Sequence, residues 1–203
     1  MGTSEVIVSL LFLATRDGGL PVKCYDAGMD RTVTLVDETG KPLGEAPILE
    51  AHTGEGKLHK AFSVYVFNKE KTKVLVQKRA EKKMLFAGIW CNTCCSHPFK
   101  DEAPQVAGER RLKEELGFTV PLREAQETFV YRALDPNGKG VEHEHVTLLI
   151  GEKDERENFT VNPDEVAEWK WVDIQEIQKD FEKNADTYAL WFTLGLPKVL
   201  ASL

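Results

Sequence analysis

Cysteine and basic charge are both scarce in this sequence, and each shortage excludes a class of protein. Only four cysteines occur among 203 residues, and three of them crowd into 91–95, which is a poor disulfide framework. A reducing compartment such as the cytoplasm is therefore expected. The net charge of -7 and the pI near 5.4 argue against a nucleic-acid-binding surface, which needs a basic field. Any anionic ligand must then be small and must be bound locally.

Long apolar stretches are also lacking. The one candidate is the run from Val6 to Ala14, which falls well short of the roughly 20 apolar residues that a bilayer-crossing helix needs. Glu5 adjoins this run and no Lys or Arg precedes it, so it does not look like a signal peptide. Internal repeats and low-complexity segments are absent as well. We expect no membrane association, and one functional site in a single domain at 30–203, after an N-terminal appendage at 1–29 of unknown role.

The arrangement of apolar and polar residues predicts an α/β (α+β) domain. Runs rich in β-branched and aromatic residues, bounded by turn residues, predict strands at 32–36, 61–67, 73–77, 128–132 and 141–150. Helices are expected from about 101 to 117, from 174 to 183 and from 188 to 200. Together these elements predict a mixed β-sheet flanked by helices.

The central predicted helix has clear signals at both ends. Asp101 is placed to cap it, Pro104 falls in its first turn, and Gly117 stands where a glycine stops it. Within it, Arg111 and Glu115 lie four residues apart and so on one side of the helix. They could form an ordinary surface ion pair. Alternatively, Glu115 could hold a cation that bridges phosphate oxygens while Arg111 neutralises the same anion.

Two further cations precede the cysteine-rich segment. Arg79 and Lys83 could complete a diphosphate clamp with Arg111, because guanidinium groups match the geometry of phosphate oxygens. Taken singly, each is better explained as a solvated charge.

Three of the five histidines stand near predicted strand ends or loops, where they could ligate a metal. They are His52, His59 and His97. Carboxylates that could accompany them lie in the predicted strand 141–150, where alternation puts Glu142 and Glu144 on one face. The opposite face carries two further histidines, His143 and His145. Either face could bind an ion, or the strand could be a solvated edge. Three imidazoles with two carboxylates suit Mn²⁺ or Mg²⁺, and also Zn²⁺.

The segment from Cys91 to Pro98 sets a thiol beside a candidate metal ligand. Cys95 and His97 are two residues apart, so their side chains emerge on the same side of an extended strand. One could react while the other holds an ion. Cys91 and Cys94 are interpreted as small packing residues, because free cysteine is often buried.

The segment from Ser96 to Phe118 resembles a Nudix box. The positions that keep the residue of the motif are Glu102, Arg110, Glu114, Glu115 and Gly117. Ser96 replaces the usual opening glycine, and Arg111 replaces a glutamate. Hydrolytic Nudix enzymes use that glutamate, with the next two, to gather Mg²⁺ for attack of water on a diphosphate. A cation at this position therefore argues against a hydrolase.

With this altered box, the sequence is similar instead to type I isopentenyl diphosphate isomerase. That family shares the Nudix fold but moves a double bond. The resemblance runs from about Asp30 to the end of the chain. Its motifs are Ala51-His-Thr53, Leu58-His-Lys-Ala-Phe62, Asn92-Thr-Cys-Cys-Ser-His-Pro98, Tyr131-Arg-Ala-Leu-Asp-Pro136, Val141-Glu-His-Glu144 and Trp191. Several spaced motifs in one order are far more specific than any single motif.

The resemblance implies a Nudix-like fold and the isomerisation of isopentenyl diphosphate to dimethylallyl diphosphate through a tertiary carbocation. The divalent metal ligands that it implies are His52, His59, His97, Glu142 and Glu144. It also implies Cys95 and Glu144 as the acid/base pair, with Tyr131 supporting Glu144.

The same resemblance assigns the substrate contacts. It implies that Glu115 and the carbonyl of Cys95 hold the Mg²⁺ that bridges the diphosphate. The diphosphate contacts that it implies are Arg79, Lys83 and Arg111, and the aromatic wall over the hydrocarbon is Trp191. The implied ligand is thus a small isoprenoid diphosphate with two kinds of divalent metal site.

Two positions depart from the family pattern. Ile48 stands where the family usually has a lysine that reaches the diphosphate, and Cys91 stands where it usually has threonine. Two other functions are weighed against isomerisation. The first is a Nudix pyrophosphatase acting on a nucleoside diphosphate derivative, against which Arg111 counts. The second is a non-catalytic, metal-stabilised binding domain.

Overall fold

The computed structural model describes residues 31–203. The predicted N-terminal appendage, with Cys24 and the apolar run at 6–14, lies outside the described residues. Within the described part of the chain, no helix combines the length and the apolar character needed to cross a membrane.

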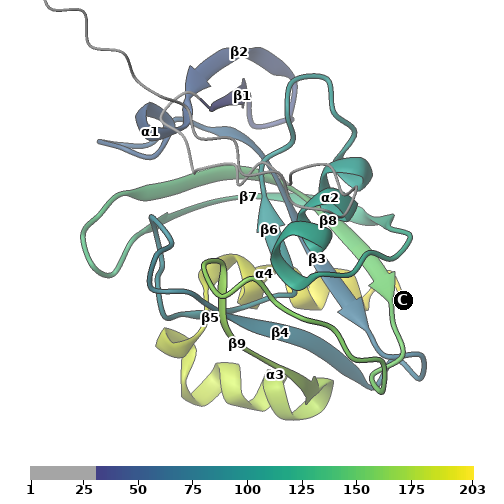
Figure 1. The fold of residues 1–203 in the computed structure, drawn as a ribbon. Coiled ribbons are helices and arrows are strands. Elements are labelled where there is room, and N and C mark those ends of the chain that lie inside the picture. The colour runs from purple at the N-terminus through teal and green to yellow at the C-terminus, as the bar shows by residue number, and fades with distance from the viewer. Residues whose placement is uncertain (1–30) are drawn as a thin grey trace, which may run out of the picture.

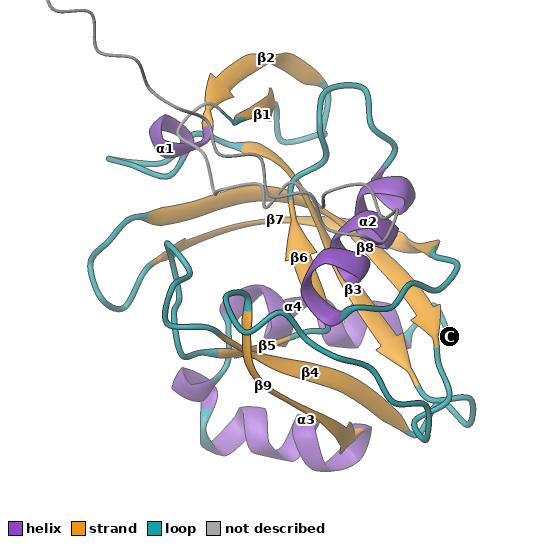
Figure 2. Cartoon of the chain, viewed as in Figure 1, coloured by secondary structure: helices purple, strands orange, loops and turns teal. Residues whose placement is uncertain are grey.

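Short runs of strands are separated by single helices, and helices end the described chain (Figure 2). The elements are β1 (Thr32–Val36), β2 (Pro42–Pro47), α1 (Ile48–Ala51), β3 (His59–Phe67), β4 (Lys73–Arg79), β5 (Trp90–Cys91), β6 (Cys94–Ser96), α2 (Pro104–Leu116), β7 (Arg123–Leu134), β8 (Val141–Glu152), β9 (Val166–Asp173), α3 (Ile174–Lys183), the 3₁₀ turn η1 (Ala185–Thr187) and α4 (Leu190–Leu200). This composition confirms the predicted mixed α/β class.

Strand β3 is the centre of a nine-stranded mixed sheet. It runs parallel to β8, which continues into β7, and antiparallel to β1 and β6. The hairpin between β3 and β4 is paired only at its turn, where Phe67 pairs with Val74. Beyond that pair β4 turns away to β9 and β5. The sheet therefore divides into two arms that diverge from the hairpin, as Figure 2 shows.

The two faces of β3 enter two different cores, because side chains alternate along a strand. Tyr65 belongs to a buried cluster with Phe192 of α4. Val64 belongs to a second buried cluster, with Leu112 of α2. Each fully buried side chain of this size contributes roughly 1.5–3 kcal/mol. Helix α2 is thus held against one face of the sheet and α4 against the other (Figure 1).

The predicted cap at the start of helix α2 is wrong, and the predicted residue at its end is confirmed. Asp101 is not its cap: Asp101 has a φ of +59°, and the N-cap is Ala103 with no side-chain hydrogen bond. Pro104 fixes the start instead, because its φ is already helical. Gly117 ends the helix in the left-handed conformation, as predicted. A Cβ on Gly117 would lie 2.3 Å from the carbonyl oxygen of Thr160, so only glycine fits.

Register within the sheet gathers residues that are far apart in sequence. Glu144 of β8 lies opposite His59 of β3 and, on its other side, opposite Tyr131 of β7. On the opposite edge of β3, Cys95 of β6 pairs with Ser63. Three strands on two sides of β3 therefore bring predicted metal-binding and catalytic residues to one end of the sheet.

Candidate active site

The predicted metal ligands form one buried cluster. It consists of His52, His59, His97, Glu142 and Glu144. One ligand atom from each lies within 4.8 Å of all the others, and all five residues are buried. Helix α1 leads into His52, β3 begins at His59, His97 follows β6, and β8 supplies both carboxylates. The strand face that carries the glutamates is therefore the one that meets the histidines.

Backbone hydrogen bonds fix the tautomers of two of these imidazoles. The Nδ1–H of His52 donates to the carbonyl oxygen of Ile48 at 2.7 Å, and that of His59 donates to Lys57 O at the same distance. The Nε2 of His59 then turns a lone pair toward the cluster, whereas the Nε2 of His52 lies 2.9 Å from Oε2 of Glu142. The Nε2 atoms of His59 and His97 lie 3.0 Å apart. Two inward-facing imidazole nitrogens at this separation are the arrangement that a shared cation would complete.

The charges of the cluster also fit a divalent cation. Burial lowers the pKa of His59 to about 4, and burial likewise lowers the pKa of His97. Both rings are therefore neutral, which is the form that ligates metal. Burial raises the pKa of Glu142, but the hydrogen bond from His52 and its charge outweigh this effect and lower it to about 2. Nitrogen and oxygen donors of this kind suit Zn²⁺, Mn²⁺ and Mg²⁺.

Glu144 is the residue that joins the cluster to the candidate catalytic groups. Its Oε1 lies 2.9 Å from the Nε2 of His97, and its Oε2 accepts a hydrogen bond of 2.8 Å from the Tyr131 hydroxyl. Burial, Glu142 and Cys95 all raise the pKa of this carboxyl. A buried carboxyl of this kind, held at both oxygens, is suited to transfer a proton in a fixed direction.

Cys95 is the partly buried thiol among the three cysteines of the cysteine-rich segment. Arg79 reaches it, with Nη1 at 3.6 Å from Sγ. A hydrogen bond with Cys91 and burial raise the pKa of the Cys95 thiol, and Arg79 opposes them. Cys91 and Cys94 are fully buried in the two cores, as their predicted packing role requires.

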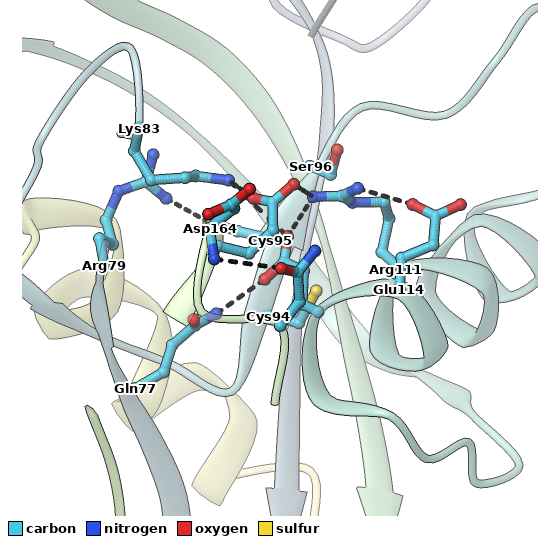
Figure 3. A network of polar contacts seen from close by, with 12 residues as sticks. Gln77, Arg79, Lys83, Cys94, Cys95, Ser96, Arg111, Glu114 and Asp164 are labelled. Atoms are coloured by element: carbon cyan, nitrogen blue, oxygen red, sulfur yellow. Dashed lines mark hydrogen bonds and ion pairs between the residues drawn. The ribbon is translucent and has the colours of Figure 1, made fainter. Parts of the chain in front are cut away.

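A second charged cluster surrounds Glu115 on α2. Arg111 forms a very short hydrogen bond with Glu115, Lys83 Nζ lies 3.8 Å from the same carboxylate, and Gln77 donates to it at 2.9 Å. Figure 3 shows Arg79 and Lys83 on one side of the β6 segment and α2 with Arg111 on the other. Burial raises the pKa of Glu115, but Arg111 and Lys83 outweigh that effect and lower it to about 2.

The surface-pair interpretation of Arg111 and Glu115 is therefore incomplete. The two residues do form an ion pair, but the side chain of Glu115 is only 2% exposed. A buried carboxylate needs this many donors to remain ionised. The carboxylate and its cations together offer an anionic ligand atom and several phosphate-binding groups within one small volume.

Trp191 forms an aromatic wall beside the thiol and the carboxyl. Its ring lies 5.0 Å from that of Phe86 and 5.8 Å from that of Tyr131, between ring centroids. The guanidinium carbon of Arg79 is 5.7 Å from the Trp191 ring. The indole Nε1–H donates to Asn92 Oδ1 at 3.0 Å, which fixes the orientation of the ring.

Four residues around this site were missed in the sequence. Gln77 and Asn92 are buried polar residues that orient Glu115 and Trp191, and only Asn92 lay within a recognised motif. Phe86 has a φ of +53°, and its N–H donates to the buried Asp135 at 2.6 Å. Arg31 lies beside Ser96 and His97. No spacing signal in the sequence connects Phe86 or Arg31 with the site.

Known proteins match this chain over most of its length. A NUDIX domain family model matches residues 57–192. The chain is 40% identical over 164 residues to "Isopentenyl-diphosphate Delta-isomerase 2" of Photorhabdus laumondii, covering 81% of this chain and 89% of the relative. It is 41% identical to "Isopentenyl-diphosphate Delta-isomerase" of Aliivibrio fischeri, covering 86% and 98%. The chain belongs to the isopentenyl-diphosphate Delta-isomerase family of Nudix proteins.

Solved structures agree on the Nudix fold. The structure of DR0079 from Deinococcus radiodurans superposes with a TM-score of 0.65 at 14% identity, covering 82% of this chain and 98% of that protein. A MutT protein from Methanosarcina mazei superposes with a TM-score of 0.55 at 16% identity, covering 71% and 94%. At these identities the likeness concerns the fold alone. The predicted Nudix-like fold and the predicted isomerase family are both confirmed.

Proposed function

We propose that this isomerase-family chain interconverts isopentenyl diphosphate and dimethylallyl diphosphate, with Cys95 and Glu144 as the acid/base pair. The observation that carries the residue assignment is the fixation of Glu144 by Tyr131 and His97, together with Cys95, the partly buried thiol of the cysteine-rich segment. Arg79 reaches both this thiol and the Trp191 ring, while Lys83 and Arg111 surround Glu115. That arrangement suits a ligand with a charged head and an apolar tail.

The reaction needs two proton transfers at neighbouring carbons. Protonation of the terminal alkene carbon of isopentenyl diphosphate leaves a tertiary carbocation at C3, and removal of a C2 proton gives the allylic product. In our proposal Cys95 Sγ and the Glu144 carboxyl carry out these transfers. The Tyr131 hydroxyl orients the Glu144 carboxyl through its 2.8 Å hydrogen bond.

The apolar wall protects and stabilises the cation. Trp191 is 2% exposed and packs against Phe86 and Tyr131, so its surroundings exclude water. The face of an indole ring attracts a cation by about 0.5–2 kcal/mol or more when both are desolvated. Exclusion of water matters because water would add to C3 and trap the cation as an alcohol.

The residues that would hold the diphosphate surround Glu115. We propose that Arg79, Lys83 and Arg111 bind its oxygens, and that Glu115 with the Cys95 carbonyl holds a Mg²⁺. When bound, this ion would neutralise charge on the diphosphate oxygens. The three cations already lie within reach of the Glu115 carboxylate or of the reactive thiol.

A second divalent ion would be held by the cluster of three histidines and two glutamates. When bound, it would offset the negative charge of the two carboxylates and fix the position of Glu144. We propose Mn²⁺, Mg²⁺ or Zn²⁺ as the ion, from the mixed nitrogen and oxygen donors.

We also propose a cytoplasmic location, supported by the unpaired state of Cys91, Cys94 and Cys95.

The test is turnover of isopentenyl diphosphate by the Mg²⁺-supplied protein, comparing the wild type with Cys95→Ala and Glu144→Gln. We expect dimethylallyl diphosphate from the wild type and losses of at least about 100-fold in each variant, since each removes a proton-transfer group. Cys94→Ala is the matched control, because Cys94 is buried in the other core. A folded, metal-loaded wild type without allylic product would refute the proposed function, and active Cys95→Ala would refute the role of the thiol.

A further inference from the structure

Arg31 precedes β1 and points its guanidinium at the segment that follows the reactive cysteine. Its Nη2 donates to the carbonyl oxygen of His97 at 2.7 Å and to the Oγ of Ser96 at 3.3 Å. Its Nε is buried and has no hydrogen-bond partner among residues 31–203. Within the same described range, Nη1 donates to no group. The guanidinium is therefore anchored at one nitrogen and left with unused donors.

Two neighbouring arginines are paired with carboxylates, whereas Arg31 has no carboxylate partner within residues 31–203. Arg110 forms two hydrogen bonds with Glu102, at 2.9 and 2.8 Å, and Arg111 donates to Glu114 at 2.6 Å. Across the described residues, Arg31 forms no ion pair with a carboxylate. The guanidinium carbons of Arg31 and Arg110 lie 5.3 and 3.9 Å from the centroid of one ring, that of Phe99. Arg31 thus adds an uncompensated positive charge to an arginine cluster.

Such a charge is costly without an anion. Burial and the charges of Arg111 and Arg110 lower the pKa of Arg31 to about 10. An arginine side chain is always charged at neutral pH. A partly buried cation beside like charges is stabilised when an anion with several acceptor oxygens reaches it.

We propose that Arg31 is a further substrate-binding residue, which binds the diphosphate together with Arg111. The inference rests on the proposed function. Arg31 contacts Ser96, the residue directly after Cys95, and Figure 3 shows Ser96 beside Arg111. A diphosphate held between Arg111 and the Cys95 carbonyl therefore lies next to the unused donors of Arg31.

The pairing of β1 with β2 supplies a rescue experiment. The backbone N–H of Ile48 donates to the carbonyl oxygen of Arg31 at 2.8 Å, continuing the register in which Thr32 pairs with Pro47. Cross-strand neighbours place their side chains on the same face of a sheet. A long cation introduced at position 48 therefore starts beside Arg31. Position 48 is also where the family resemblance predicts a lysine.

The primary test compares Arg31→Gln with Arg31→Lys, and with Arg156→Gln as the control for loss of an exposed arginine. In Arg31→Gln we expect the KM for isopentenyl diphosphate to rise by at least about tenfold, as for loss of a charge-assisted hydrogen bond. The value of kcat should change by less than about threefold, because the proton-transfer groups are intact. Arg31→Lys should recover part of the loss, and Arg156→Gln should match the wild type.

Inorganic pyrophosphate serves as a probe without a hydrocarbon. Its calorimetric dissociation constant in the presence of Mg²⁺ should rise in Arg31→Gln by a factor similar to that of the KM. The double variant with Ile48→Lys should restore both constants. Bound-metal stoichiometry should equal that of the wild type, because Arg31 touches only the backbone of His97.

Three results would overturn the inference. These are unchanged KM and pyrophosphate binding in Arg31→Gln, an equal effect in Arg156→Gln, or loss of bound metal in Arg31→Gln, which would assign Arg31 a structural role. A wild type that binds pyrophosphate through Arg31 but makes no allylic product would instead refute the proposed function alone. The two failures are thus distinguishable.

Discussion

The site contains two charged regions that are built on opposite principles. The metal-ligand cluster of three histidines and two glutamates holds imidazoles and carboxylates whose ligand atoms converge within 4.8 Å. The Glu115 cluster instead has its carboxylate already paired with Arg111 and Lys83. The first region contains two carboxylates and neither arginine nor lysine, whereas the second contains more cations than its carboxylate requires. One is therefore suited to bind a cation and the other to bind an anion.

The difference also separates what each region contributes. The metal-ligand cluster includes Glu144, the group that we propose to transfer a proton, in contact with His97. The Glu115 cluster lies around the segment of Cys95, where we propose that the diphosphate binds. Changes in one region should therefore alter chemistry and metal content, while changes in the other should alter substrate affinity.

The largest effect is expected from a substitution that removes one ligand of the metal-ligand cluster. Replacement His97→Ala removes one of three imidazoles, and we predict that metal affinity falls by more than the roughly 10- to 100-fold that loss of an outer hydrogen-bonding partner costs. Bound metal is measured by elemental analysis after dialysis. The thermal midpoint of the variant should also stop responding to added metal, since saturating ligand at 100 times its Kd contributes about 2.7 kcal/mol. Undiminished stoichiometry would remove His97 from the ligand set.

A smaller effect is expected in the Glu115 cluster. In Glu115→Gln we predict about a tenfold higher Mg²⁺ requirement and KM, because a charged oxygen ligand is lost while the geometry is kept. The metal content of the histidine cluster should not change. Glu114→Gln is the matched control, since Glu114 is the neighbouring, more exposed carboxylate on α2. Equal effects in the two variants would contradict the special role of Glu115.

Mild acid should affect the metal-ligand cluster but not the Glu115 cluster, and this is the smallest of the expected effects. Burial lowers the pKa of His52, but the hydrogen bond and charge of Glu142 outweigh this and raise it above its usual 6.5. Protons therefore compete with metal at His52 as the pH falls from about 7 to about 6, and metal affinity should fall by less than about tenfold over this range. Glu115, with a lowered pKa of about 2, stays ionised over this range. Metal titration calorimetry at several pH values measures the effect, and affinity that rises toward acid would contradict it.

Local patterns predicted the regular elements well. The helix predicted at 174–183 has the observed bounds of α3, and Gly117 ends α2 as predicted. The cap of α2 was wrong because Pro104 alone fixes the start there. Strand β9 was missed, although Trp169 and Trp171 alternate with polar residues.

The site was predictable only where short motifs carried it. Glu142 and Glu144 share a face by alternation, but their choice over the two histidines of the opposite face depended on the family resemblance and on the register of β8 against β3. Arg31 could not be found from its own sequence context. It reaches Ser96, which lies 65 residues further along the chain, because β1 and β6 both pair with β3. Long-range register of this kind leaves no periodicity in the sequence.

The most direct test of the central claim is one nuclear magnetic resonance measurement in deuterated water. Isopentenyl diphosphate is incubated with the Mg²⁺-supplied wild type, and both the carbon-bound protons and the phosphorus signals are followed. The account predicts dimethylallyl diphosphate with deuterium in a methyl group, because the added proton comes from an exchangeable acid, and with its diphosphate intact. Release of phosphate, or an allylic product without solvent deuterium, would contradict it.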